Sequence, residues 1–487
     1  MGNVTTSEQN NITSPNGNSL AVFVEGTTGE MKVKDINGNI QPLSDFVGGG
    51  GSSPFEYNAN ATGIQPILGT NDASGLNATI GGGTNNIATG NKTFIGGGGN
   101  NNVTNYFATI GGGFGSTASS TYSTIGGGLS NTVSGGKSTI GGGESNTASG
   151  DKSTIGGGQG NIASSNYTTI GGGCGNTASA SYSKVGGGRG NNASGYGSTI
   201  GGGRYNCAYG QCSTIGGGAY NTANDRSFVG GGYSNNAGGF WSTIGGGYNN
   251  IASNNYSTIG GGKYNTASGQ CSTIGGGYNN TASCTYSTVS GGQNNIASGD
   301  YSSIGGGQNN TASGSRSTIG GGDSNTACGE KSFIGGGASN TASSNYSTIG
   351  GGKNNISSSN YYSTIGGGLS NTVSNSYSTI GGGQSNTASQ KNSTIGGGRS
   401  NNASGSYVTI GGGYSNTASG NYSAILGGLS NTTNTCACAM IVGSNITADR
   451  VCTTFVNNLS IKNIPTSGAG LPDGSVFRIG GALCIVY

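Results

Sequence analysis

The 487-residue chain contains no histidine, and this absence removes several kinds of active site at once. Ser-His-Asp and Cys-His nucleophilic catalysis both depend on an imidazole as general base. Metal sites with histidine ligands are excluded for the same reason. The glycine runs do not continue into the Gly-Lys-Ser/Thr of a phosphate-binding loop. We therefore expect a protein that is not an enzyme and that has no cofactor and no metal.

Charged residues are also scarce, since Lys, Arg, Asp and Glu together make up 7% of the residues. The net charge of +3 is spread thinly, so no basic patch can follow a phosphate backbone, and nucleic acid is not an expected partner. No apolar run approaches the ~18 residues of a membrane-spanning helix. The start, MGNVTTSEQNN, lacks the pattern of a secretory signal. It fits the N-myristoylation pattern at Gly2, and whether Gly2 is acylated stays open.

Proline is also rare, with 6 residues, whereas glycine accounts for 108. High glycine with only 30% apolar residues is often typical of disorder. Here glycine and serine recur with a strict period, as in the stretch STIGGGESNTASGDKSTIGGG from residue 138 to 158. A fixed short period over hundreds of residues predicts a solenoid, in which each repeat forms one turn.

Each turn can be numbered from an Ile or Val at position 0, which recurs every 15 residues over about 25 turns. The consensus is Tyr-Ser-Thr-Ile-Gly-Gly-Gly-x-x-Asn-Thr-Ala-Ser-Gly-x. A 14-residue step ends at Val229, and a 16-residue step ends at Ile365. We expect both irregular steps to disturb the stacking locally, and they are candidate places for a bend in the shaft.

The consensus predicts two short strands per turn, because three glycines beside β-branched residues exclude a helix. Ser at position −2, Ile at 0, Asn at +6 and Ala at +8 are expected to point inward. Lys and Arg occur at position −3, which is therefore an outward position. Glycines of the triplet and near position +10 are expected to supply positive φ at the corners, and stacked Asn side chains to form an amide ladder. The residues that represent this repeat core are Ile125, Ile140, Ile155, Ile170, Ala148 and Asn146.

The predicted fold class is all-β: a parallel β-solenoid of about 15-residue turns with small β caps at both ends. Each turn buries little more than one Ile and one Ala, which is worth a few kcal/mol. Ordering each residue costs ~1–2 kcal/mol, so a lone column is marginal. We therefore expect a homotrimer, intertwined or side by side. The pattern does not decide whether the Ile column faces the protomer interior or the trimer axis.

Composition divides the chain into four regions. They are an attachment region with a small β-meander (1–47), a flexible link with the first irregular turns (48–76), the solenoid shaft (77–445) and a C-terminal cap (446–487).

Cysteines and tyrosines are the remaining candidates for binding. The spacing of Cys436, Cys438, Cys452 and Cys484 is not a zinc signature, and we favour isolated thiols over a soft-metal site. Exposed aromatic rings can stack on sugars, but tyrosines can also cover the backbone of neighbouring turns, which we favour because Lys and Ser share their positions. The candidate aromatics at position −3 are Tyr122, Tyr167, Tyr256 and Tyr346, and those just after the glycines include Tyr220, Tyr233, Tyr248 and Tyr278.

The segment STIGGGESNTASG, from Ser138 to Gly150, resembles the head repeats of trimeric autotransporter adhesins in the placing of Ile140, Gly141, Ala148 and Gly150. The resemblance covers residues 77 to 445, and it implies a left-handed parallel β-roll that is trimeric and serves attachment. The first corner is longer than in that family. The C-terminal segment NIPTSGAGLPDGSV, from Asn463 to Val476, is similar to the ends of fibre and structural proteins of tailed phages and large aquatic viruses.

The leading hypothesis is therefore a virion fibre whose trimeric shaft serves host attachment or surface decoration. The expected partners are further copies of the chain, other virion proteins at one end, and a host surface receptor or glycan. The expected location is the virion surface, after synthesis in the host cytoplasm. One alternative is a bacterial surface adhesin at the cell surface. Another is ice binding by outward Thr and Ser of the Thr-Ala-Ser segment, although Ile162 and Ile251 interrupt that array.

Overall fold

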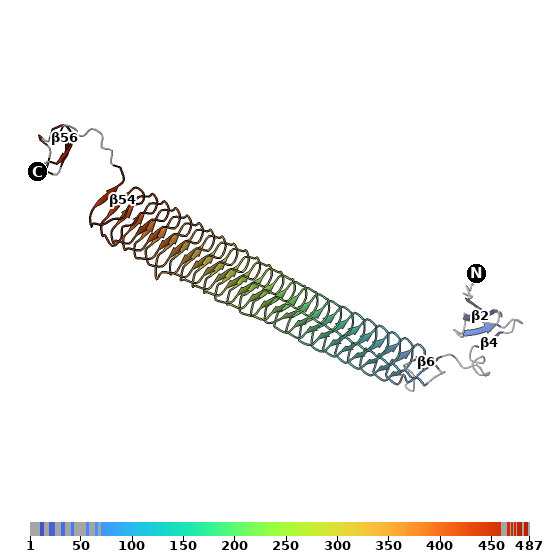
Figure 1. Cartoon of the computed structure of the whole chain (residues 1–487). Coiled ribbons are helices and arrows are strands. Elements are labelled where there is room, and N and C mark those ends of the chain that lie inside the picture. The colour runs from blue at the N-terminus through green and yellow to red at the C-terminus, as the bar shows by residue number, and fades with distance from the viewer. Residues whose placement is uncertain are drawn as a thin grey trace, which may run out of the picture. The chain divides into compact units, whose positions relative to one another are not determined.

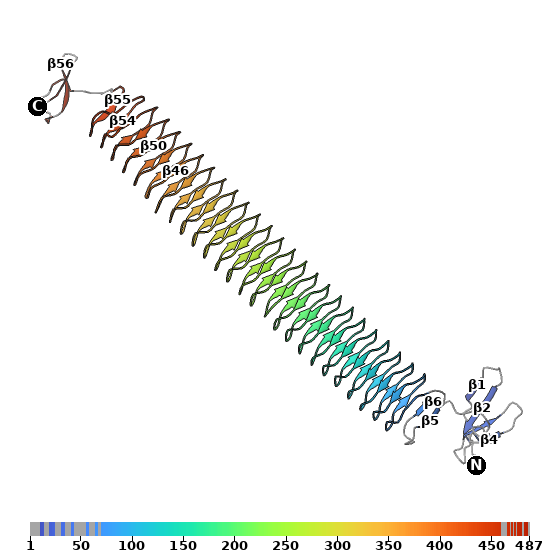
Figure 2. The ribbon, with the colours of Figure 1, turned by 60° about the horizontal axis from the view of Figure 1, so that its bottom comes forward.

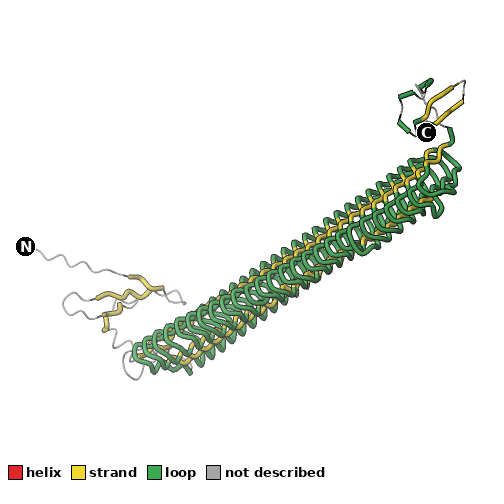
Figure 3. Tube along the Cα trace, turned by 90° about the vertical axis from the view of Figure 1, so that its left-hand side faces the viewer, coloured by secondary structure: helices red, strands yellow, loops and turns green. Residues whose placement is uncertain are grey.

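A computed structural model describes residues 70–458 continuously, together with short segments on either side. These are 10–13, 19–24, 31–34, 40–42, 55–57 and 64–66 before the continuous part, and 465–467, 469–470, 472–473, 475–479 and 482–485 after it. The described residues form strands and turns and include no helix (Figure 3). The chain divides into two compact units, Met1–Cys212 and Ser213–Tyr487, which are treated in turn.

The first unit opens with a four-stranded antiparallel sheet in the order β1-β2-β3-β4. Its strands are β1 (Asn10–Thr13), β2 (Ser19–Val24), β3 (Met31–Lys34) and β4 (Ile40–Pro42). The last three overlap the segments whose alternation suggests a meander, and β1 is an additional strand. Gly2 and the glycine-rich link at 48–53 lie outside the described residues.

A short hairpin connects to the first sheet of the solenoid. Its strands β5 (Phe55–Tyr57) and β6 (Ile64–Pro66) pair antiparallel. Strand β6 then pairs in parallel with β7 (Thr79–Ile80), where the backbone N–H of Ile64 donates to the carbonyl oxygen of Ala78 at 3.1 Å. The hairpin thus gives the edge of the first turn a hydrogen-bonded neighbour.

The rest of the first unit is a parallel solenoid with two strands per turn (Figures 1 and 2). The first sheet contains the odd-numbered strands from β7 to β23 (Thr199–Ile200), each made of the residues at positions −1 and 0. The second contains the even-numbered strands from β8 (Ile87–Ala88) to β24 (Cys207–Ala208), each made of positions +7 and +8. Neighbouring strands pair in register, so each Ile lies beside the Ile of the next turn.

The second unit repeats this arrangement from β25 (Thr214–Ile215) to β53 (Ala424–Ile425) in the first sheet. Its second sheet contains β26 (Thr222–Ala223) to β52 (Thr417–Ala418). The first sheet continues through β54 (Met440–Val442) and β55 (Thr454–Val456). A separate antiparallel hairpin near the C-terminus consists of β56 (Val476–Ile479) and β57 (Ala482–Ile485). Within both units the prediction of a parallel β-solenoid with turns of about 15 residues is confirmed.

Register is kept through both irregular steps of the second unit. Ile215 pairs with Val229 across the short step, and Ile349 pairs with Ile365 across the long one. The extra residue of the long step lies in the corner between β44 (Ile356–Ser357) and β45 (Thr364–Ile365), and Ser357 of β44 occupies the place of the usual buried Ala. The Ser357 hydroxyl forms hydrogen bonds with the hydroxyls of Ser344 and Ser363, and the Ser359 hydroxyl donates to the same two groups. The disturbance is therefore local, and a bend at these steps stays a prediction.

The corners of each turn depend on residues with positive φ, as the turn from Ile140 to Ile155 illustrates. Gly143 has φ of 91°, and a Cβ there would lie 2.0 Å from the carbonyl oxygen of Gly158. Ser145 and Lys152 are left-handed as well, with φ of 55° and 57°. The expectation of positive φ at the glycine near position +10 is wrong, because Gly150 is not among the left-handed residues. The left-handed residue of that corner is instead the one at position −3.

The interior of each turn is closed within one protomer. The side chains at positions −2, 0, +6 and +8 are buried in nearly every turn, and the Ile or Val at position 0 is 0–1% exposed. The Ile column therefore faces the interior of the protomer rather than an axis between protomers. Nearly every turn also buries one Asn, and usually one Ser, so its core combines apolar packing with internal hydrogen bonds.

Candidate binding surface

Buried asparagines form a ladder on the inside of the solenoid, in which Ser116 takes the place of one asparagine. The backbone N–H of Asn146 donates to Oδ1 of Asn131 at 3.0 Å, and Asn161 donates in the same way to Asn146. The Nδ2 of Asn146 donates to the carbonyl oxygens of Gly142 at 3.1 Å and Gly158 at 2.8 Å. Each amide thus satisfies backbone groups of its own turn and of the following turn, and bonds to the Asn side chains of the neighbouring turns, which leaves it no capacity to bind a ligand.

The residues predicted to form the repeat core all lie in this interior. They are 0% exposed and comprise Ile125, Ile140, Ile155, Ile170, Ala148 and Asn146. Any binding surface must therefore come from the outward positions.

One outward column consists of the residues at position −3, which we call the left-handed ridge. It contains the four predicted aromatics: Tyr122, Tyr167 and Tyr256 are 51%, 40% and 52% exposed, and Tyr346 is half-buried. All four have φ of 59–60°. This conformation is unusual for tyrosine and was not predicted. Glycine and asparagine, which adopt positive φ more readily, also occur at this position, at Gly197 and Asn392. Their presence is the feature of the sequence that could have indicated the left-handed conformation.

Rings on the left-handed ridge stack from turn to turn in the first unit. Phe107 and Tyr122 are parallel within 8°, with centroids 5.0 Å apart, and Tyr167 and Tyr182 within 4° at 4.9 Å. Lys152 joins the second stack, with Nζ 4.6 Å from the ring centroid of Tyr167 and 2.5 Å from its hydroxyl oxygen. The hydrogen bond with this hydroxyl raises the pKa of Lys152 above 10.5.

The ridge of the second unit has the same construction. Tyr286 and Tyr301 stack at 5.0 Å, and the Tyr346 ring lies 4.8 Å from that of Tyr362. Lys331 donates to the hydroxyl of Tyr346 at 2.9 Å, and this bond raises the pKa of Lys331. Most of these rings thus have another ring or a cation over one face, which agrees with the interpretation that they cover neighbouring turns.

A second group of aromatic residues, the tyrosine cluster, lies at the corner after the glycines of the second unit. Two of its rings, Tyr233 and Tyr248, are parallel within 7° at 5.2 Å. Lys263 lies over the rings of Tyr248 and Tyr264, at 5.1 and 4.9 Å. The members are 37–42% exposed and comprise Tyr220, Tyr233, Tyr248, Tyr264 and Tyr278.

The cysteines do not form a metal centre among the described residues. Cys436 is buried, and its Sγ donates to the carbonyl oxygen of Ala448 at 3.4 Å. Cys438 and Cys452 lie side by side on consecutive turns of the left-handed ridge, and their hydrogen bond raises the pKa of Cys438. The side chain of Cys484 lies outside the described part. Across that part, no three Cys, Asp or Glu side chains converge as metal ligands would.

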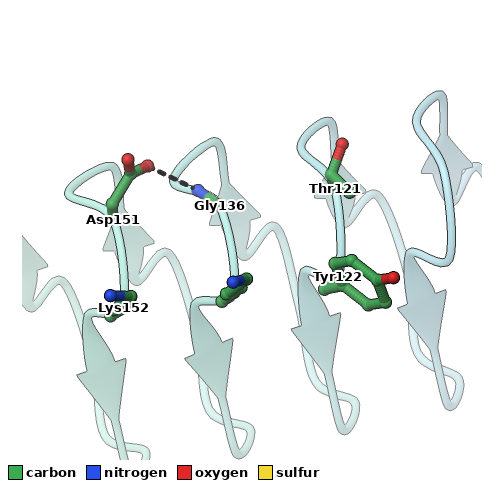
Figure 4. Close-up of a pocket in the computed structure, with 6 residues that line it drawn as sticks. Thr121, Tyr122, Gly136, Asp151 and Lys152 are labelled. Carbon is green, nitrogen blue, oxygen red and sulfur yellow. Dashed lines mark hydrogen bonds between the residues drawn. The ribbon is translucent and has the colours of Figure 1, made fainter.

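A notch of about 220 Å³ opens on the surface of the first unit where a side chain is missing (Figure 4). Gly136 lies between Thr121 and Asp151 of the neighbouring turns, at position −4. Its backbone N–H donates to Oδ1 of Asp151 at 2.8 Å. Tyr122, Lys137 and Lys152 from the left-handed ridge complete the lining.

Comparisons with known proteins leave the family open, since the sequence matches no protein-family model and no curated protein. Over the described residues, no helix has the length and apolar character needed to cross a membrane.

Proposed function

We propose that the chain forms the shaft of a trimeric surface fibre on a virion that serves host attachment or surface decoration. The observation that carries this proposal is the repetition of one closed turn throughout both units. All inward side chains of a turn serve only to hold it to its neighbours. Such an array is suited to spanning distance and presenting an outer surface, as repeat proteins do.

The finer features of the shaft belong to the same proposal. We take the solenoid to be left-handed, with end caps at 1–47 and 446–487 that attach it to other virion proteins and protect its edges. Because the Ile column is enclosed within each protomer, we expect the trimer contacts to involve the outward Thr residues of a sheet face. Buried Asn and Ser hydrogen bonds add to the apolar packing of each turn, so the resemblance to adhesin heads is the main support for a trimer.

The decisive experiment is light scattering of the purified full chain, combined with negative-stain electron microscopy. A rod with a mass near three times 47.3 kDa supports the fibre. A compact monomer contradicts it. Immunogold labelling of virus particles and of cells from the source culture then distinguishes a virion fibre from a bacterial surface adhesin.

Ice binding is the remaining alternative, and outward Thr residues are the feature that favours it. Threonine lies at position −1 in five consecutive turns, from Thr109 to Thr169, before Lys184 interrupts the column. At position +7 the exposed Ile162, Ile251 and Ile296 interrupt the other sheet. An assay of ice recrystallisation tests this alternative, and we expect no inhibition because neither array is continuous.

A further inference from the structure

The notch around Gly136 is unlike the rest of its surface column. Among the turns with anchors from Ile95 to Phe455, Gly136 is the only glycine at position −4, where the other turns have larger residues. A Cβ at Gly136 would lie 3.3 Å from Oδ1 of Asp151, so any side chain would enter the notch. Thr121 and Asp151 are two turns apart, or about 9.6 Å at the spacing of parallel strands. A gap of this width accepts one sugar ring.

The walls of the notch combine an exposed aromatic ring with polar atoms that have no partner among the described residues. Tyr122 is 51% exposed and stacks on Phe107 on one side; Lys137 is the next residue of the ridge on its other side, and its ammonium does not lie over the Tyr122 ring. Asp151 uses only Oδ1 in a hydrogen bond with described residues, which leaves Oδ2 as an acceptor. The side chain of Lys137 has no hydrogen-bond or ion-pair partner in the described part, whereas Lys152 is held by Tyr167.

We propose that this notch binds a single acidic sugar residue, a hexuronate. The C–H face of a pyranose ring carries partial positive charge and complements the π face of Tyr122. Oδ2 of Asp151 accepts from sugar hydroxyls, and the ammonium of Lys137 pairs with the sugar carboxylate. Two lysines and one aspartate give the notch a net positive charge, which favours an anionic sugar over a neutral one. The proposal deepens the attachment role and rests on it for its biological meaning.

Binding is tested on the full chain with methyl β-D-glucuronoside as the probe and methyl β-D-glucoside as the neutral comparison, by saturation-transfer NMR and calorimetric titration. A single small ligand on an open site is expected to bind with a dissociation constant of about 1–10 mM. The glucuronoside should bind at least about five-fold more tightly, since only it can pair with Lys137. Equal binding of N-acetylglutamate amide would show recognition of a carboxylate alone and would overturn the sugar assignment.

The sharpest variant is Gly136→Thr, which fills the notch. Thr285 occupies the same position in another turn, and its N–H donates to Oδ1 of Asp300 at 3.2 Å, so this variant can keep both the fold and the bond to Asp151. We expect glucuronoside binding to fall by at least ten-fold. Ser181→Thr is the matched control, because it introduces a threonine at position −4 of a different turn, away from the notch. It should bind the glucuronoside like the wild type. Unchanged binding by Gly136→Thr would overturn the proposal.

Lys137→Gln removes the positive charge of this side chain and keeps a polar side chain in its place. We expect it to abolish the preference for glucuronoside over glucoside while the glucoside still binds; a retained preference would overturn the role of Lys137. These measurements do not depend on assembly. A monomer that binds through the notch would refute the trimeric fibre alone, and a trimeric rod that does not bind would refute the notch alone.

Discussion

The backbone N–H of Asn146 donates to the side-chain Oδ1 of Asn131 in the preceding turn over 3.0 Å, and both residues are completely buried. The same contact recurs between buried asparagines along both units. It ties backbone to side chain across each inter-turn gap, in addition to the strand hydrogen bonds. The stability of the solenoid thus depends on a polar element inside its core, whose desolvation cost is offset because the buried amide atoms are hydrogen-bonded.

Asn146→Ala should lower the free energy of unfolding by about 3 kcal/mol or more. The substitution leaves the carbonyl oxygen of Gly142 and the N–H of Asn161 without their partner, and it removes one of the two donors to the carbonyl oxygen of Gly158, which keeps the N–H of Glu144. Urea unfolding followed by circular dichroism measures the change. Glu144→Ala in the same turn is the control, because Glu144 is exposed and other turns have Ala at this position. Equal effects of the two substitutions would contradict the importance of the ladder.

The second and third glycines of the triplet should differ in their tolerance of substitution. Gly143→Ala should destabilise the protein by about 3 kcal/mol or more, because φ is 91° and the new Cβ would overlap the carbonyl oxygen of Gly158. Gly142→Ala should change stability by less than about 1 kcal/mol, since nothing lies within 4 Å of its Cβ. Unfolding measurements compare the two, and hydrogen exchange locates the damage. Similar losses in both variants would refute the distinction.

The inward and outward positions could be predicted from the sequence because two-residue alternation and outward Lys and Arg leave few arrangements. The corners could be predicted only in part, since the positive φ expected within the glycine triplet is found at its third glycine, as at Gly143. Ser145 and Lys152 have positive φ although serine and lysine do not favour it, since closing a 15-residue turn imposes the conformation on whichever residue stands there. The expectation for the glycine near position +10 is wrong for the same reason: Gly150 lies two residues before Lys152, the left-handed residue of that corner.

The candidate site was only partly accessible from the sequence. Tyr122 was recognisable as an outward aromatic residue, but its stacking on Phe107 depends on the turn-to-turn spacing. The notch arises from a missing side chain at Gly136, and a glycine carries no signal in a chain with 108 of them. It becomes visible only when the turns are aligned and the position −4 column is compared.

Removal of the Tyr167 hydroxyl should lower the pKa of Lys152, since that hydroxyl is the main cause of its raised pKa. Tyr167→Phe should shift the titration of the Lys152 ¹³Cε signal to lower pH and leave Lys331 unchanged. Tyr346→Phe should do the reverse, because Lys331 is raised by Tyr346. A raised pKa stabilises the fold while the lysine is protonated, so this contribution is complete below pH 10.5 and is lost as pH rises through the raised value. If neither substitution changes the titration of Lys152 or Lys331, the tyrosine hydroxyls are not the cause of the raised pKa values.

Oxidised glutathione should convert Cys438 and Cys452 into a disulfide. Both occupy position −3 of consecutive turns, and the in-register pairing of Met440 with Thr454 holds them side by side. Neighbouring parallel strands are about 4.8 Å apart, within the Cα separation of about 4.4–6.8 Å that a disulfide requires. Exchange oxidises the two thiols and reduces one glutathione disulfide to two glutathione thiols. Because the pKa of Cys438 lies above 9.0, its thiolate fraction is small at neutral pH, and the reaction should accelerate as pH rises.

Peptide mapping by mass spectrometry identifies the product as a linked pair of peptides that has lost two hydrogen atoms. Cys452→Ser is the control, and it should leave Cys438 with a glutathione adduct that no neighbouring thiol can displace. Cys212 and Cys271 lie on the same ridge without a cysteine at position −3 of an adjacent turn, and should also stop at the adduct. Adducts on Cys438 and Cys452 in the wild type, without a link between them, would show that the ridge holds the two thiols too far apart or in the wrong direction to react with each other.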